Sequence, residues 1–299
     1  MAFELWAVFT LLAVVTWASS NVIDKIVLTK WVKNPYLPIM IVSVVGLVFS
    51  LFVYLSQGLS ALTMNQLILT LLLGLTYVVT VIFYFKAIQI EEISRIIPLY
   101  SAAPLFVLIL ASVFLGEFFA IDKYFGIFFL VMGGILISIK KGFKISLGKA
   151  FLFMMLSSLS WAASSVLTRY LVSSIDFWTV FVYARIGQFL AALPIFYLHA
   201  KELVNVIKQY GKKVLVGMTV SETLAVGGTL LYTIALSFSL GYASLVSALA
   251  AAQQFFVLLI ATFLSLFYPK IIKEDTNNRT IWLKLIAMIL LVIGVVLIT

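Results

Sequence analysis

The chain has no cysteine and a single histidine, His199. Without cysteine, neither a disulfide framework nor a thiolate metal site can form, and the redox compartment is left undetermined. Charged residues are also scarce, since they make up 10% of the 299 residues, whereas a soluble domain usually carries about 25%. These scarcities exclude a soluble globular domain.

Apolar sequence takes the place of the missing charge, with 64% hydrophobic residues and a mean hydropathy of +1.20. A membrane-spanning helix needs about 20 mostly apolar residues, and ten stretches meet this requirement. They are continuously apolar instead of alternating, which favours helices over membrane strands. The expected spans are Phe3–Ile23, Tyr36–Ser56, Gln66–Lys86, Arg95–Phe114, Ile121–Ile139, Lys149–Val172, Phe177–Leu198, Val214–Ser237, Tyr242–Phe267 and Ile281–Ile298.

The basic residues that give the chain its net charge of +9 lie between the apolar stretches. There they set membrane orientation, so no nucleic-acid partner is expected. All lysines and arginines except Lys123, Arg169 and Arg185 lie in or beside the loops that follow odd-numbered spans. This bias predicts cytoplasmic odd-numbered loops and external termini in a multi-pass plasma-membrane protein. The first span lacks a basic segment before it, so no cleaved signal peptide is expected.

The two halves of the sequence repeat each other. TWASSNVIDK, from Thr16, matches SWAASSVLTR, from Ser160, so that Trp17 falls on Trp161. FVLILAS is matched by FVLLIAT, and GGILIS by IGVVLIT, in the same order. Five spans per repeat is an odd number, so the second copy enters the membrane from the opposite side. The predicted fold is therefore an all-α integral membrane protein. Its ten transmembrane helices form two inverted five-helix repeats, 1–139 and 149–299, joined by a basic linker, 140–148.

One region resembles a known family. The segment ISRIIPLYSAAPLFVLILASVFLGE, from Ile93 to Glu117, is followed by GIFFLVMGGILIS, from Gly126 to Ser138. Together with the early TWASSN segment, it resembles the ten-span drug/metabolite transporters of the EamA type. The second half departs from the pattern, because Gln253-Gln254 stand where the first half has Ala103-Pro104. The resemblance implies a transporter whose cavity is lined by helices one to four and six to nine. It also implies cytoplasmic termini, which is opposite to the charge bias.

A buried charge pair is the main candidate site. Glu222 lies within the apolar stretch TVSETLAVGG, and Arg185 lies within VYARIGQ of the preceding, antiparallel span. Both are expected at a similar depth near the midplane, where a charge is costly unless it is paired or hydrated. Two interpretations stay open, which are a structural ion pair and a pair that contacts substrate or a proton. Thr229 lies on the same helical face as Glu222.

Other polar and aromatic side chains are expected to contribute to the same site. For each of them the alternative is packing between helices or contact with lipid. The substrate-binding prediction comprises Glu222, Arg185, Gln254, Gln253, Asn21, Trp17, Trp161, Tyr84, Tyr100 and Thr229.

The remaining ionisable residues are expected outside the membrane core. Glu117 is interpreted as a surface helix cap, and His199 as a solvated loop residue. An intramembrane hydrolase would need a Ser–His pair or two aspartates within spans. The aspartates instead lie at span ends or in loops, namely Asp24, Asp122, Asp176 and Asp275. No catalytic residue, metal site or cofactor is therefore predicted.

These observations favour a secondary transporter of a small organic metabolite that works by alternating access. One buried acid and one buried base suit an amphipathic or zwitterionic solute such as an amino acid, and proton linkage is a further hypothesis. A non-transporting membrane scaffold or receptor is the alternative. The expected partners are the solute and the lipid bilayer, and homodimerisation is left open.

Overall fold

A computed structural model describes residues 4–32, 34–90, 102–138, 148–238 and 242–267. It also describes residues 282, 286, 289, 290, 292–294, 296 and 297 of the last predicted span. Throughout these ranges the secondary structure is helical, without a strand. The predicted first half of span four, the basic linker and most of span ten lie outside the described residues.

The helices follow the apolar stretches of the sequence. Six of them are long and apolar enough to cross a membrane, which makes the protein a multi-pass membrane protein. These six are α1 (Leu5–Lys30), α2 (Tyr36–Gln57), α3 (Met64–Ile90), α7 (Lys149–Val172), α8 (Phe177–Tyr210) and α9 (Lys212–Ser237). The shorter helices are α5 (Ala103–Phe114), α6 (Ile121–Ser138), α10 (Ala243–Ala250) and α11 (Gln253–Phe267).

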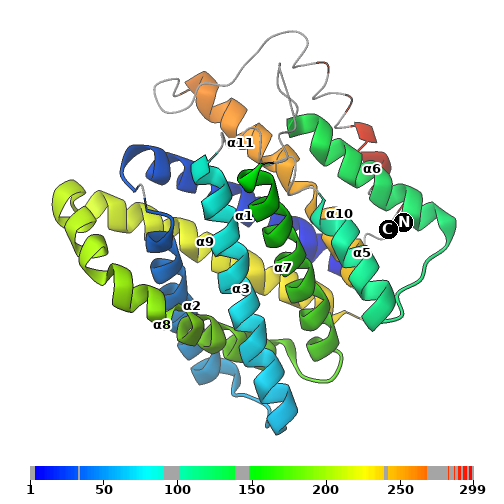
Figure 1. Cartoon of the computed structure of the whole chain (residues 1–299). Helices are drawn as coiled ribbons and strands as arrows, with labels where there is room; N and C mark the ends of the chain where they lie inside the picture. Colours follow the sequence, from blue (N-terminus) through cyan, green and yellow to red (C-terminus); the bar gives the residue numbers. More distant parts are fainter. Residues whose placement is uncertain are drawn as a thin grey trace.

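Helices from the two halves of the chain alternate in the bundle. α1 packs along α9, α3 packs along α7, and α2 packs along α8. Figure 1 shows α2 and α8 at one side of the bundle and α5, α6 and α10 at the other. The core is therefore built from contacts between the first and second halves, and each half depends on the other for burial.

The packing of α3 on α8 depends on two glycines. A Cβ built on Gly74 would lie 2.2 Å from the backbone nitrogen of Gln188 and 2.3 Å from the carbonyl oxygen of Ala184. A Cβ on Gly187 would lie 2.4 Å from the carbonyl oxygen of Leu71. The two backbones meet at a distance that no larger residue permits.

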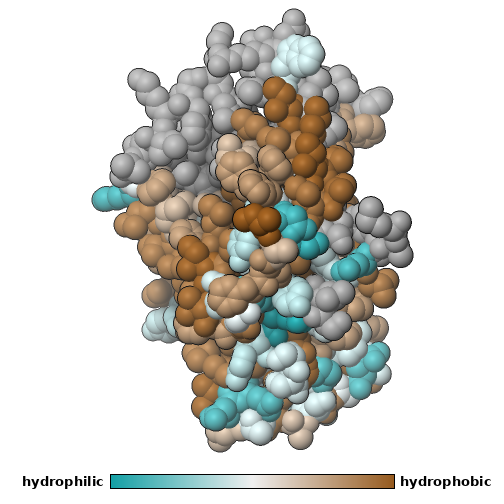
Figure 2. Space-filling model, turned by 90° about the vertical axis from the view of Figure 1, so that its right-hand side faces the viewer, coloured by the Kyte–Doolittle hydropathy of each residue, from teal (hydrophilic) through white to brown (hydrophobic). Residues whose placement is uncertain are grey.

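Exposed apolar side chains cover the outside of the bundle. On α2, Phe52 is 73% exposed and Leu55 75% exposed, and Phe114, Phe125 and Phe128 are exposed on α5 and α6. Figure 2 shows that hydrophobic residues cover much of one face, with hydrophilic residues gathered toward its centre and lower end. A surface of this kind is suited to lipid.

The ninth predicted span is not continuous. We expected one helix over Tyr242–Phe267, but the structure has a turn at Ala251 and Ala252 between α10 and α11. The segment contains neither proline nor an internal glycine after Tyr242, so no breaker marked the turn. α11 begins at Gln253, which the repeat matches with Ala103, the first residue of α5.

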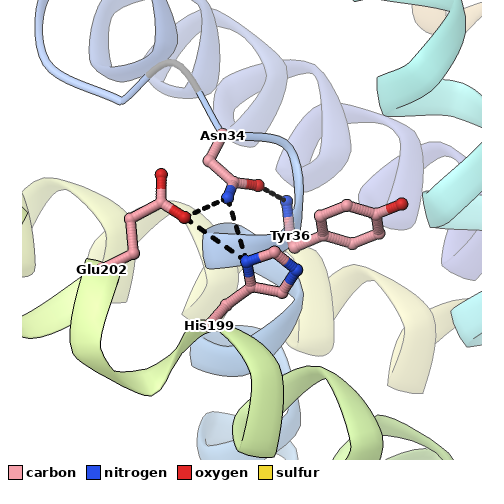
Figure 3. Close-up of polar contacts among 4 residues, drawn as sticks. All are labelled: Asn34, Tyr36, His199 and Glu202. Carbon is pink, nitrogen blue, oxygen red and sulfur yellow. Dashed lines mark hydrogen bonds and ion pairs between the residues drawn. The ribbon is translucent and has the colours of Figure 1, made fainter.

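His199 does not lie in a loop, as the sequence had indicated, because α8 continues to Tyr210. Its ring stacks on Tyr36, with centroids 4.7 Å apart. Its Nδ1 lies 3.2 Å from Nδ2 of Asn34 and 3.3 Å from Oε2 of Glu202; Asn34 also donates to Glu202 (Figure 3). The residues after Leu198 are good helix formers, so the helix extends past its apolar part. This cluster fastens α8 to the start of α2.

Glu117 is a second correction, because it is only 4% exposed. Its carboxylate accepts hydrogen bonds from the backbone nitrogens of Ala243 and Ser244, at 2.8 and 3.0 Å. It also accepts one from Oγ of Ser244 at 2.7 Å. The carboxylate thus caps the N-terminus of α10, where the helix dipole favours an anion. The local sequence could not indicate a partner 126 residues away.

The start of α8 carries a cap that is local in the sequence. Asp176 accepts from the backbone nitrogen of Thr179 at 2.9 Å and from Oγ of Ser60 at 2.5 Å. Partial burial raises the pKa of this carboxyl, but these hydrogen bonds outweigh it and hold the pKa below its usual value. Asp176 lies outside the candidate spans, as predicted.

Candidate functional site

Glu222 lies on the buried side of α9. Its side chain is 6% exposed, and α1 packs along this helix. Among the described residues, no hydrogen bond or ion pair joins its carboxylate to a partner. It interacts electrostatically with Asp24 of α1 and Arg185 of α8. A buried carboxylate is costly unless it is paired, protonated or hydrated, so Glu222 is a candidate functional residue.

Arg185 is also buried, at 3% exposure. Its Nη1 donates to Oε1 of Gln188 at 2.5 Å, whereas Nε and Nη2 have no hydrogen-bond partner in the described part of the chain. The guanidinium lies 5.0 Å from the ring centroid of Tyr77 and 5.1 Å from that of Phe181. Aromatic rings can stabilise a cation, but they leave its N–H groups free to donate.

Gly46 of α2 makes room for this arginine. A Cβ at this position would lie 3.0 Å from Cδ of Arg185. The absence of a side chain on α2 therefore lets the arginine stem lie between α2 and α8. Arg185 and Glu222 influence each other electrostatically without forming a direct ion pair within 4.0 Å. Neither side chain therefore donates a hydrogen bond to the other or accepts one from it.

Asp24 is a residue of this region that sequence reasoning missed. α1 continues beyond the first predicted span to Lys30, so Asp24 lies inside the helix. Oγ of Ser221 donates to Oδ1 of Asp24 at 2.5 Å, and Ser221 also contacts Oγ of Ser20 at 3.0 Å. A signal was present, since Ser20 and Asp24 are four residues apart and share a helix face. Ser221 of α9 thereby holds Asp24 of α1 close to Glu222.

An aromatic cluster joins α1, α7 and α9. The rings of Trp17 and Trp161 meet edge to face with centroids 5.3 Å apart, and Tyr232 lies 5.3 Å from Trp17 and 5.5 Å from Trp161. Nε1 of Trp17 donates to the carbonyl oxygen of Ala225 at 3.1 Å. The hydroxyl of Tyr232 donates to Oγ of Ser165 at 3.1 Å. Two tryptophans that the repeat matched are thus neighbours in space.

The other predicted residues have more varied surroundings. Thr229 is buried, and its hydroxyl donates to the carbonyl oxygen of Ala225 within α9. Tyr84 packs edge to face on Phe85 and interacts electrostatically with Asp24. Asn21 and Gln253 are partly buried, the former on α1 and the latter at the start of α11. Tyr100 and the side chain of Gln254 lie outside the described part.

The described residues contain no group of three or more histidine, aspartate or glutamate side chains that could hold a metal ion. What the region offers instead is one cation with free N–H groups, two carboxyl groups and a cluster of aromatic rings. This combination can bind both charges of a small solute, and it can exchange a proton.

Comparison with known proteins agrees with these features. Residues 4–139 match the model of the EamA-like transporter family. A solved structure described only as "Crystal structure of protein" is similar over 98% of this chain and 96% of its own, with 14% identity and a TM-score of 0.71. At that identity the likeness shows the fold alone. A search of curated proteins found no match.

The first half of the chain therefore carries an EamA-like transporter domain, which confirms the resemblance to drug/metabolite transporters. The family consists of membrane transporters of small solutes rather than enzymes.

Proposed function

We propose that the protein is a secondary active transporter. It carries a small amphipathic or zwitterionic solute, with amino acids foremost, across the plasma membrane by alternating access. One observation carries this proposal: Arg185 and Glu222 are both buried and interact electrostatically, and Nε and Nη2 of Arg185 have no hydrogen-bond partner in the described part of the chain. The arginine would bind a carboxylate of the solute and the glutamate its ammonium group. Protonation of Glu222 would accompany transport.

The ten-span inverted repeat is part of the proposal, with repeats 1–139 and 149–299 and the linker 140–148. The pairing of α1 with α9 and of α7 with α3 is what a two-fold relation between the repeats predicts. Matched residues in contact would lie close to such an axis, and the 5.3 Å ring contact of Trp17 with Trp161 supports this arrangement. Both pairings also contain a hydroxyl contact, Ser20 with Ser221 at 3.0 Å and Ser164 with Thr76 at 2.8 Å. An inverted repeat places its binding site between the two halves near the midplane.

The remaining candidates would surround the solute. Trp17 and Trp161, with Tyr232 beside them, offer apolar ring surface for the side chain of an amphipathic solute. In this proposal, polar groups on the neighbouring helices complete the site, namely Asn21, Tyr84, Tyr100, Thr229, Gln253 and Gln254.

The experiment for this function is solute uptake by the purified protein in sealed vesicles. Glu222→Gln keeps the shape of the side chain but removes its titration, so we expect a folded protein whose uptake no longer depends on pH. Asp122→Asn is the control, since Asp122 is an exposed acid in the first turn of α6, and it should keep the wild-type pH profile.

Labelled amino acids, amines, nucleosides and sugar phosphates should be compared in the same assay. Uptake of none of them would favour the scaffold or receptor alternative. Normal uptake by Glu222→Gln at every pH would show that this carboxyl carries no proton during transport.

The charge bias makes a separate prediction about orientation. The chain has no native cysteine, so a single introduced cysteine is its only thiol, and labelling can be read on the purified protein. We expect Ser174→Cys, between α7 and α8, to react with an impermeant maleimide on intact cells. Gln209→Cys, at the end of α8, should react only after the cells are opened. The reverse result would support the cytoplasmic termini that the family resemblance implies.

A further inference from the structure

Two acids and one cation share the buried region between α1, α8 and α9. Asp24 is held by Ser221, the neighbour of Glu222 in the sequence, and the two carboxyl groups interact electrostatically. Arg185 acts on Glu222 from α8. With both acids ionised, the three side chains sum to one negative charge. In a membrane, a buried charge without compensation is strongly unfavourable.

The described side chains around these acids offer no other cation. α2 and α10 contain no charged residue. On α3, Tyr77 and Tyr84 face the charged groups, while Lys86 lies 5.9 Å from the ring centroid of Phe153 on α7.

The remaining described charges on the helices packed against α9 lie at the helix ends. At the end of α7, Arg169 donates to the carbonyl oxygens of Leu236 and Phe238, and its guanidinium lies 5.8 Å from the ring centroid of Tyr242. The start of α7 carries Lys149, the start of α9 Lys212 and Lys213, and the polar end of α8 Lys201, Glu202 and Lys208. Among the described side chains, Asp24, Glu222 and Arg185 therefore leave one negative charge uncompensated; the side chains of Lys25 and Lys30 on α1 lie outside the described part.

A zwitterionic solute cannot supply the compensating positive charge, because its carboxylate and its ammonium cancel. A solute with a second ammonium group can supply it. We infer that the Asp24–Glu222 pair takes up one positive charge per transport cycle. This charge is a proton when the solute is net neutral and the second ammonium group when the solute is a cationic amino acid. This inference rests on the proposed function, and it names the solute property that decides whether a proton is carried.

The two modes differ in the carrier of the charge but not in its amount. With a neutral solute, a proton from the aqueous side binds one carboxyl oxygen of the pair and is released with the solute on the opposite side. With a cationic solute, the second ammonium lies between the carboxylates and displaces that proton. Each mode moves one positive charge across the membrane, so both respond to the membrane potential, but only the first changes the pH inside.

L-Norleucine and L-lysine test this difference, because they have the same carbon chain and differ in the terminal ammonium group. Uptake of each into vesicles that contain the purified protein should be measured with an internal pH indicator and at several imposed potentials. We expect both uptakes to depend on the potential. Norleucine should acidify the interior, and lysine should leave its pH unchanged. Equal proton movement with both solutes would overturn the inference while leaving the transport function intact.

Asp24→Asn provides the second arm. With one acid removed, Arg185 and Glu222 balance each other, so norleucine uptake should lose both its proton movement and its dependence on the potential. Lysine should lose a carboxylate partner, and its KM should rise about tenfold or more. Asp122→Asn, which changes an exposed acid in the first turn of α6, should behave like the wild type.

The outcomes distinguish failure of the Asp24–Glu222 role from failure of the amino-acid transport function. Proton movement with norleucine that is unchanged in Asp24→Asn would overturn the role of the pair. If the wild-type protein transports neither solute, the amino-acid function itself is wrong, and the inference fails with it. The comparison of the two solutes in the wild type needs no variant, so it decides the question even if Asp24→Asn folds poorly.

Discussion

Gly74→Ala is expected to disrupt the packing of α3 against α8. The added Cβ would meet backbone atoms of Gln188, Ala184 and Gly187 at 2.2, 2.3 and 2.4 Å. No rotamer change relieves a clash with backbone, so one helix must move away along its whole contact. Overpacking of a core typically costs about 1–3 kcal/mol and occasionally more. We expect the upper end of this range, because a whole helix must shift.

The measurement is the thermal unfolding midpoint in detergent, together with the elution profile on size exclusion. Gly227→Ala is the matched control, since a Cβ on this glycine of α9 meets nothing within 4 Å. Alanine is favoured over glycine inside a helix by about 1 kcal/mol, so the control should be as stable as the wild type or more stable. If the two variants unfold at the same temperature, the close approach of α3 and α8 is wrong.

The second large effect is expected at Arg185. Arg185→Ala removes the cation that acts on Glu222 and leaves this buried carboxyl, with Asp24 near it, without that cation. Removing one partner from a buried charge pair typically costs about 3–5 kcal/mol. The structure shows no direct ion pair, and protonation of an acid can offset part of the loss, so we expect about 2–3 kcal/mol.

A second substitution distinguishes this electrostatic effect from lost packing. Arg185→Ala combined with Glu222→Gln should unfold at a higher temperature than Arg185→Ala alone, because the carboxylate that lost its cation is then neutral. Lys201→Ala, at an exposed position on the same helix, should stay close to the wild type. If the double variant is no more stable than the single one, the arginine stabilises the fold through its ring contacts and not through Glu222.

The sequence predicted the helices well where the apolar stretch and the helix coincide. α7 has the predicted bounds Lys149–Val172, α2 differs from prediction by one residue at one end, and α6 begins at the predicted Ile121. The sequence predicted the helix ends poorly where a helix continues beyond its apolar stretch. α1 and α8 both extend beyond their apolar parts, and this displaced Asp24 and His199 from their expected positions. Hydropathy measures the fit to lipid, whereas helix ends depend on local propensity and caps.

For the site, the sequence predicted costly charges within the spans at Glu222 and Arg185, and both side chains are buried in the protein. The residues that lie near Glu222 and Arg185 could not be predicted, because they depend on which helices pack side by side. Asp24 reaches Glu222 only through the packing of α1 on α9, which joins residues 197 positions apart at Ser221. The roles of the ten candidate residues stay predictions for the uptake experiments.

The capping of α10 by Glu117 has a consequence for biosynthesis. Ala243 follows Glu117 by 126 residues, so the acceptor is made long before its donors. At about 5–20 residues per second, the ribosome needs about 6–25 s to reach the start of α10. Through this interval the nascent first half holds a carboxylate without its final donors, and α1, α2 and α3 await partners not yet synthesised. Insertion machinery that shelters such a half-chain would therefore raise the yield of this protein more than faster translation would.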